Sequence, residues 1–270
     1  MKVRLISAAV LLPLLLVVVL ALPEIVTAFW LAAACAIAAY ELLYQTELVR
    51  HGRLVIYSMV IAALVPIWCC FGMHHAWGML GLLVFVCALF GEMMRNHIKL
   101  RFETVAVCFV AGILIPYLFS GLLRILMTEG GKKLIFIPLI LAFIPDSGAY
   151  FAGMYFGRHK LAPVISPKKT VEGAVGGCIS AVLVMLLYTL IMQLAFSCKI
   201  NYGFALIYGI VGSLGDVFGD LMFSVIKRQT GIKDYGRLIP GHGGILDRFD
   251  SMMIVAPLTE VLLALLPVVV

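Results

Sequence analysis

The sequence predicts an all-α integral membrane protein, a polytopic bundle of about nine transmembrane helices. Of its 270 residues, 63% are hydrophobic and 13% are charged, and the mean hydropathy is +1.11. Soluble domains average about 45–50% apolar and 25% charged residues, so this composition excludes a soluble domain. Several apolar runs approach the roughly 20 residues that a helix needs to cross a bilayer. The seven cysteines lie mostly inside these runs, which favours reduced thiols over a disulfide framework.

The apolar runs define the expected spans. They cover residues 5–22, 25–44, 54–71, 76–94, 104–123, 134–151, 173–197, 203–227 and 251–270. The first run lacks a small-residue cleavage pattern, so we expect a retained helix rather than a signal peptide. The run at 134–151 is short, which leaves a re-entrant segment open. We expect one membrane domain over 1–270, with N-terminal helices in 1–133 and catalytic helices and cytoplasmic loops in 134–270.

The positive charge of the chain indicates its topology. The net charge is +6, which in a membrane protein reflects loop orientation first, so we expect no nucleic-acid partner. Four of the 20 Lys and Arg residues fall on one side of the expected topology, namely Arg124, Lys132, Lys133 and Lys199, and the other 16 fall opposite. The positive-inside rule places the side with 16 in the cytoplasm. A short chain with minimal loops is typical of a bacterial inner-membrane protein.

A polar stripe follows the run at 203–227. It consists of Ser213, Asp216, Asp220, Ser224 and Lys227. At 100° per residue these five side chains fall within about 80° of one another on a helix. Carboxylates within a membrane helix are costly against lipid, so we expect a cavity or a counter-ion beside them. Structural aspartates bonded to neighbouring helices are the alternative.

The loop that follows the stripe is rich in glycine and charge. Gly236, Gly241, Gly243 and Gly244 allow the backbone to approach a ligand and to direct amides at it. Asp247 and Asp250 precede the last apolar run, so we expect them at the start of its helix. For Asp250, a simple helix cap is a strong alternative.

Two shorter segments also carry charge. In ISPKKTVEG, from Ile165 to Gly173, Ser166 suits a helix N-cap and Pro167 the first turn. Lys168 and Lys169 would then oppose the helix dipole, a conflict that a bound anion would resolve. A plain positive-inside pair is the alternative. The neighbouring glycines at 173, 176 and 177 indicate close helix packing.

In PDSGAY, residues 145–150, we expect the proline to interrupt or kink the sixth run and to expose backbone beside Asp146. An acidic residue in a broken membrane segment predicts a functional site. A solvated loop aspartate is the alternative.

The stretch from Ser224 to Asp250 resembles the signature of the phosphatidate cytidylyltransferases, also called CDP-diacylglycerol synthases. The matching pattern is S-x-x-K-R-x4-K-D-x-G-x3-P-G-H-G-G-x-L-D-R-x-D. DSGAY at 146–150, SPKKTVEG at 166–173 and GDVFGD at 215–220 resemble further elements of that family, in the same order. The detailed likeness covers about the second half of the chain, whereas the first half agrees in being apolar helices.

This resemblance implies transfer of the cytidylyl group of CTP to phosphatidic acid at a membrane. We expect a magnesium ion, with room for a second cation, because two polyanionic substrates must meet. Expected metal ligands are Asp220 and Asp247, supplemented by Asp216 and Asp250. Expected catalytic residues are Asp220, Asp247, Lys227, Ser224 and Arg248. Expected substrate contacts are Asp146, Lys168, Lys169, Lys233, Asp234, Arg237, Gly241, His242, Gly243 and Gly244. A homodimer is among the assemblies that we consider.

Two other classes of protein remain as alternatives. An ion-coupled membrane transporter also carries acidic residues in its helices, but transporters often show a hydropathy repeat, and the charges here gather toward one face. Another membrane phosphotransferase, such as a CDP-alcohol phosphotransferase, would show the pattern D-x2-D-G-x2-A-R, which this sequence lacks.

Overall fold

The computed structural model describes residue 13, residues 16–239, residue 241 and residues 243–269. The chain forms two compact units, one of residues 1–132 with 227–249 and the other of residues 133–226 with 250–270. The loop at 227–249, expected among the catalytic elements of the second half, therefore belongs to the unit that the N-terminal helices build. The expectation of one domain over 1–270 stays a prediction.

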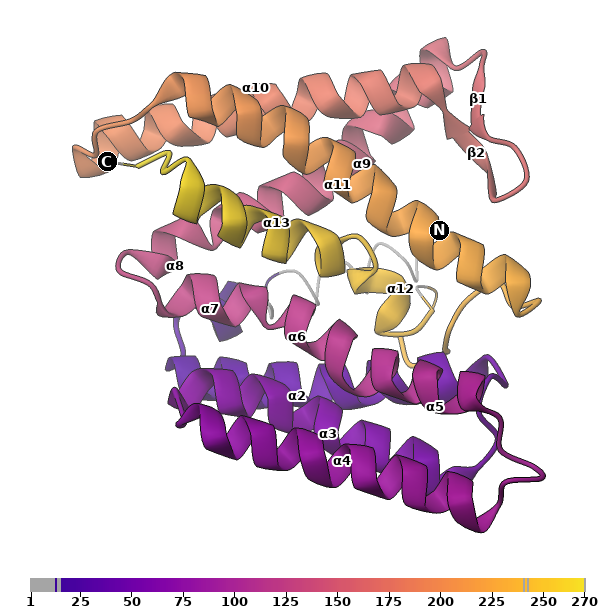
Figure 1. Ribbon diagram of the computed structural model, residues 1–270. Coiled ribbons are helices and arrows are strands. Elements are labelled where there is room, and N and C mark those ends of the chain that lie inside the picture. The colour runs from indigo at the N-terminus through magenta and orange to yellow at the C-terminus, as the bar shows by residue number, and fades with distance from the viewer. Residues whose placement is uncertain (1–12, 14–15, 240, 242, 270) are drawn as a thin grey trace. The chain divides into compact units, whose positions relative to one another are not determined.

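The first unit is helical (Figure 1). Its elements are α2 (Glu24–Tyr40), the π-helical turn η1 (Glu41–Gln45), α3 (Gly52–Phe71), α4 (His75–Arg95), α5 (Phe102–Phe109), the π-helical turn η2 (Val110–Leu114), α6 (Ile115–Phe119), α7 (Gly121–Met127) and α12 (Leu246–Phe249). Helix α2 packs on α3, and α3 packs on α4. Small buried side chains such as Ala28, Ala32 and Cys35 line α2, and side chains of this size let membrane helices approach closely.

The second unit consists of long helices and one small sheet. Its elements are α9 (Phe136–Phe156), β1 (Lys160–Ala162), β2 (Ser166–Thr170), α10 (Val171–Phe196), α11 (Tyr202–Gln229) and α13 (Met252–Leu265); the short α8 (Gly131–Leu134) and the last residues of α11 cross the division between units. Helices α9 and α10 pack closely. A Cβ at Gly177 would lie 2.7 Å from the carbonyl oxygen of Pro145, and one at Gly173 2.9 Å from that of Ala149. The close packing predicted from these glycines is confirmed.

In the described part of the chain, seven helices are long and apolar enough to cross a membrane. They are Glu24–Gln45, Gly52–Phe71, His75–Arg95, Phe102–Met127, Gly131–Phe156, Val171–Phe196 and Tyr202–Gln229. Each matches one of the nine predicted runs. Of the other two runs, 5–22 lies largely outside the described residues, and 251–270 forms the 14-residue helix α13. The exact count of nine stays a prediction, while an all-α polytopic membrane architecture agrees with the structure.

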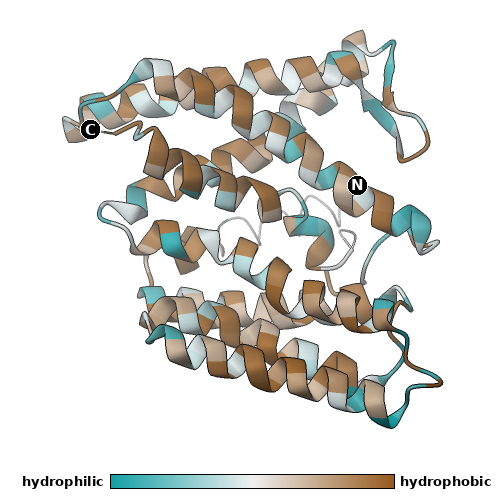
Figure 2. Ribbon diagram, viewed as in Figure 1, coloured by the Kyte–Doolittle hydropathy of each residue, from teal (hydrophilic) through white to brown (hydrophobic). Residues whose placement is uncertain are grey.

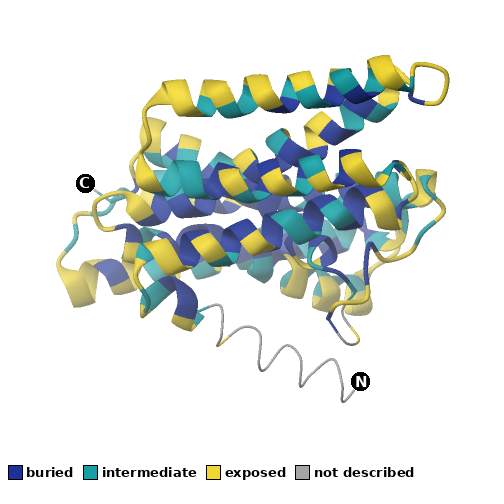
Figure 3. Cartoon of the chain, turned by 90° about the horizontal axis from the view of Figure 1, so that it is seen from below, coloured by how far each residue is buried: buried dark blue, intermediate teal, exposed yellow. Residues whose placement is uncertain are grey.

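Apolar residues predominate along these helices (Figure 2), and many helix residues are exposed (Figure 3). On α10, the side chains of Ile179, Leu183 and Leu187 are exposed although each is aliphatic. They recur every four residues and so share one helix face. Exposed apolar stripes of this kind are unfavourable in water and suit contact with lipid. The seven cysteines all lie in the described part of the chain and form no disulfide, as predicted.

The sequence prediction for SPKKT was wrong. Residues Ser166–Thr170 form strand β2, which pairs antiparallel with β1, rather than the first turn of a helix. Helix α10 begins at Val171, and the Thr170 hydroxyl caps it by accepting a 3.1 Å hydrogen bond from the Gly173 amide. Thr170 supplies the cap that we assigned to Ser166. Both lysines therefore precede the helix instead of occupying its first turn, and the argument for a bound anion that rested on a first-turn position falls.

The interruption predicted at PDSGAY was also wrong, whereas a kink at Pro145 stays a prediction. Pro145 lies inside α9, which continues to Phe156. Membrane helices tolerate proline because their neighbours re-satisfy the freed backbone groups. Asp146 is therefore an exposed residue on a continuous helix and not part of a broken segment.

Candidate active site

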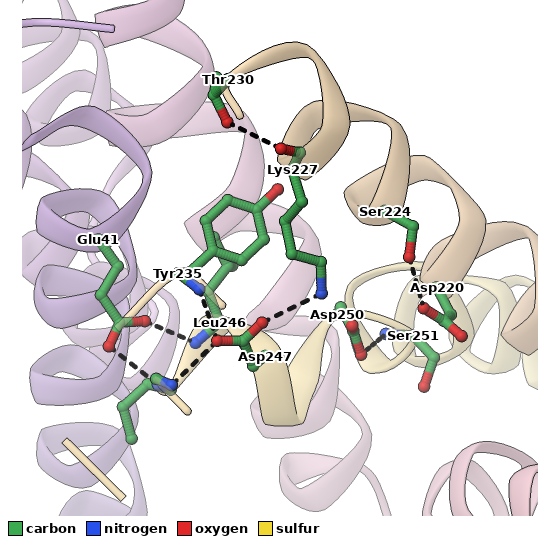
Figure 4. Close-up of polar contacts among 12 residues, drawn as sticks. Glu41, Asp220, Ser224, Lys227, Thr230, Tyr235, Leu246, Asp247, Asp250 and Ser251 are labelled. Carbon is green, nitrogen blue, oxygen red and sulfur yellow. Dashed lines mark hydrogen bonds and ion pairs between the residues drawn. The ribbon is translucent and has the colours of Figure 1, made fainter. Parts of the chain in front are cut away.

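In the second unit, Asp220 on α11 has the counter-ion that the sequence predicted. The Lys169 Nζ atom, at the end of β2, lies 2.6 Å from Asp220 Oδ2. The Ser224 hydroxyl, one helical turn along α11, donates a 3.1 Å hydrogen bond to Asp220 Oδ1 (Figure 4). The two charged side chains retain 21% and 26% of their exposure, so the pair is shielded but accessible. A carboxylate expected to bind metal and a lysine expected to bind phosphate thus meet.

Asp216 lies one turn before Asp220 and is 1% exposed. Its Oδ1 atom has no hydrogen-bond partner among the described residues. Asp146 on α9, Lys169 on β2 and Asp220 all lie close enough to interact electrostatically with its carboxyl group. Three carboxylates and one lysine therefore share a neighbourhood built from three elements, and the negative charge exceeds the positive.

Asp250 belongs to the same unit. Its Oδ1 atom accepts a 3.0 Å hydrogen bond from the Ser251 amide, immediately before α13. A Cβ at Gly219 on α11 would lie 2.8 Å from Ser251 Cα, so the turn that carries Asp250 packs against α11 beside Asp220. The prediction that Asp247 and Asp250 both start the last helix needs correction, because Asp247 lies in the separate short helix α12. A backbone turn at Asp250 and Ser251 divides the two helices.

In the first unit, Asp247 is the centre of a hydrogen-bond cluster (Figure 4). The Tyr235 and Gly244 amides donate to Asp247 Oδ2 at 2.7 and 3.0 Å. Lys227 Nζ lies 3.0 Å from Asp247 Oδ1 and 5.3 Å from the centre of the Tyr235 ring. Asp247 is 6% exposed, so its charge is matched inside the protein. Hydrogen bonds to a charged group contribute about 1.5–3 kcal/mol each.

Two glycines of this loop, Gly243 and Gly244, lie against the Asp247 carboxylate. Gly241 and Gly243 have φ of +77° and +86°, which favours glycine. A Cβ at Gly243 would lie 2.6 Å from Asp247 Oδ2. The Gly244 amide, predicted to point at a ligand, instead donates to Asp247. His242 lies outside the described residues.

The remaining predicted contacts are exposed. These are Lys168 on β2, Lys233, Asp234 and Arg237 in the loop, and Arg248 on α12. Their exposure leaves them accessible to a substrate, and their roles stay predictions.

Glu41 was not singled out from the sequence. It begins η1 at the end of α2 and is 2% exposed. Its Oε1 accepts a 3.0 Å hydrogen bond from the Ile245 amide, and its Oε2 accepts one of 2.8 Å from the Leu246 amide. The signal that could have revealed it is an acidic residue within a membrane-spanning apolar run.

The carboxylate oxygens of the candidate site are of the type that magnesium prefers as ligands. Among the described residues, no three His, Cys, Asp or Glu side chains are placed to hold one ion. Magnesium, however, is usually bound through one or two carboxylates together with substrate phosphates and water, rather than by an all-protein cage. The buried Asp216 oxygen without a partner and the excess of carboxylates around it suit a cation.

Helices fit to span a bilayer and a polar cluster of carboxylates and lysines define an integral membrane protein with a charged site. The chain belongs to the Cytidylyltransferase family, whose sequence model matches residues 2–266. A phosphatidate cytidylyltransferase of Thermotoga maritima is 30% identical over 98% of this chain and 97% of its own length. Proteins of the same name from Staphylococcus epidermidis and Staphylococcus saprophyticus are 40% and 42% identical over 166 residues. The chain matches 61% of the length of these two relatives.

Proposed function

We propose that this protein transfers the cytidylyl group of CTP to phosphatidic acid, giving CDP-diacylglycerol and pyrophosphate. The observation that carries the proposal is the Lys169–Asp220 pair, in which a cation and a carboxylate suited to a metal–phosphate site meet beside buried Asp216. The family match and the names of the relatives support the choice of substrates. The same match favours this enzyme over a transporter or another membrane phosphotransferase.

The reaction joins two polyanions. A phosphate oxygen of phosphatidic acid attacks the α-phosphorus of CTP, the bond between the α- and β-phosphates breaks, and pyrophosphate leaves. Because the attacking oxygen is already an anion, no strong general base is required. The enzyme must position the substrates and neutralise their charge, which are the main demands of phosphoryl-type transfer.

The side chains take the following roles in this proposal. Asp220 and Asp247 hold magnesium, Asp216 and Asp250 supplement them, and Ser224 orients Asp220. When bound, magnesium would neutralise phosphate charge and polarise a phosphoryl oxygen. Lys168, Lys169, Lys227 and Arg248 neutralise phosphates, and Lys227 leaves Asp247 Oδ1 to do so while the backbone amides keep hold of Oδ2.

Asp146 and the loop residues contact the nucleotide. Lys233, Asp234 and Arg237 lie over CTP, and Gly241, His242, Gly243 and Gly244 are the further contacts that we propose for it. In this proposal the chemistry occurs at the cytoplasmic face of a bacterial inner membrane, and the excess of basic residues in the loops of one side supports the cytoplasmic assignment. All of these residues come from one chain, so the proposal needs no homodimer.

The direct test combines purified protein, CTP, magnesium and phosphatidic acid in detergent mixed micelles. We expect cytidine-linked lipid and pyrophosphate in equal amounts, and no product after chelation. Diacylglycerol, which lacks the attacking phosphate, is the matched control and should give none. Absence of lipid-linked cytidine, or its formation from diacylglycerol, would overturn the proposal; substrate flux in proteoliposomes without covalent product would favour a transporter.

A further inference from the structure

A carboxylate from the N-terminal helices holds the loop that carries Asp247. Glu41 lies in the candidate span Glu24–Gln45 and is 2% exposed. A buried carboxylate in a membrane helix is costly unless it is paired, and such residues mark functional positions. Each of its two oxygens accepts one backbone amide hydrogen, from Ile245 and Leu246, residues more than 200 positions away in sequence.

The loop is shaped to receive this carboxylate. A Cβ at Gly236 or at Gly244 would overlap Glu41 Oε1. Phe249 of α12 stacks edge-on with Trp30 of α2, with ring centres 5.8 Å apart, and packs on Phe119 of α6 at 5.1 Å. Two glycines and an aromatic anchor therefore seat the loop on the N-terminal helices, and Glu41 makes the polar part of that contact.

Glu41 and Asp247 hold successive amides of one turn. Asp247 accepts the Gly244 amide hydrogen, and Glu41 accepts those of Ile245 and Leu246, the two residues before Asp247. Glu41 also begins the π-helical turn η1, and π-turns within α-helices often occur at functional sites. The backbone from which the Asp247 side chain projects is thus fixed by a second carboxylate.

We propose that Glu41 is a positioning residue, whose carboxylate holds the Gly244–Leu246 turn so that Asp247 keeps its orientation for turnover. The catalytic consequence rests on the proposed function, while the structural part does not. This gives the N-terminal helices a role in the reaction besides anchoring the chain.

Glu41→Gln is the informative variant, because glutamine keeps the size of the side chain but has one acceptor oxygen for two amides. We expect kcat to fall 10- to 100-fold, the usual effect of losing a residue that orients a ligand, without a matching rise in KM for CTP or phosphatidic acid. Hydrogen–deuterium exchange of peptides covering 235–249 should become about tenfold faster through local opening. Peptides covering 160–176 should not change.

Two further variants make the test specific. Glu41→Asp keeps both acceptor oxygens on a side chain one methylene shorter, and should recover part of the protection and part of kcat. Glu92→Gln is the matched control: Glu92 is 4% exposed on α4 and pairs with Arg53 on α3. It should leave exchange at 235–249 and kcat unchanged.

Unchanged exchange at 235–249 in Glu41→Gln would overturn the proposal. Faster exchange with normal kcat would overturn its catalytic part, and an equal effect of Glu92→Gln would reduce Glu41 to a general packing role. If the wild-type protein makes no CDP-diacylglycerol, the proposed function fails, and the exchange data still decide whether Glu41 holds the turn.

Discussion

The two carboxylates expected to bind metal, Asp220 and Asp247, differ in what already surrounds them. Asp247 has protein donors on both oxygens, two of them backbone amides, and its side chain is 2% exposed. Asp220 pairs with the side chains of Lys169 and Ser224 and keeps 26% of its side-chain exposure. A carboxylate bonded to backbone amides shapes the chain around it, whereas one bonded to side chains can exchange them for a ligand.

This difference teaches that an aspartate in a conspicuous motif can carry structure and chemistry at once. Each cluster lies within its own compact unit. Substitutions in the Asp220 cluster should lower turnover with little effect on stability. Substitutions in the Asp247 cluster should lower both turnover and stability.

The largest expected effect is that of Asp220→Asn on turnover. The loss of one charged group that acts on a phosphoryl centre should lower kcat about 10²–10³-fold. Unfolding in detergent should change by less than about 1 kcal/mol, since the Lys169 pair is partly exposed and Ser224 can still donate to the amide oxygen. Near-normal turnover in this variant would remove Asp220 from the metal assignment.

Asp247→Asn should lower turnover and stability together. Asparagine can keep its oxygen toward the Tyr235 and Gly244 amides, but it then presents an NH₂ group to Lys227. The lost charge-assisted contacts should cost about 1–3 kcal/mol of unfolding free energy. Denaturant unfolding of Asp247→Asn and Asp220→Asn measures the difference between the two clusters directly. Equal unfolding free energies of the two variants would contradict that difference.

Gly244→Ala tests the fit between the loop and Glu41. The added Cβ would overlap Glu41 Oε1, and overpacking of this kind costs about 1–3 kcal/mol. Gly52→Ala is the matched control, because no described atom lies within 4 Å of its added Cβ. Unfolding measurements that rank the two variants equally would contradict the close approach.

The smallest predicted effect concerns the cap of α10. Thr170→Val keeps the side-chain shape but removes the oxygen that accepts the Gly173 amide hydrogen, so stability should fall by about 1 kcal/mol. Ser166→Ala should lower the stability by less than Thr170→Val does, since Ser166 lies in β2 and not at the helix start. A larger effect at Ser166 would restore the helix start first expected there.

Much of this arrangement follows from the sequence, because composition and periodicity encode it. Span length reveals the membrane helices, and the spacing from Ser213 to Lys227 reveals a polar helix face in need of a counter-ion. The cap at Thr170 was missed because Ser166-Pro167 offers an equally good local start signal. The contacts of Asp247 with the Tyr235 amide and of Glu41 with Ile245 are tertiary, and neither spacing nor periodicity records which backbone amide meets which carboxylate.

The fate of the CTP phosphates tests the central claim most directly. Wild-type protein should be given CTP labelled at the α-phosphate or at the γ-phosphate, together with phosphatidic acid and magnesium. The account predicts that the α-label enters the lipid and that the γ-label leaves in pyrophosphate. Label from the γ-phosphate in the lipid, or no labelled lipid from either nucleotide, would contradict cytidylyl transfer by this protein.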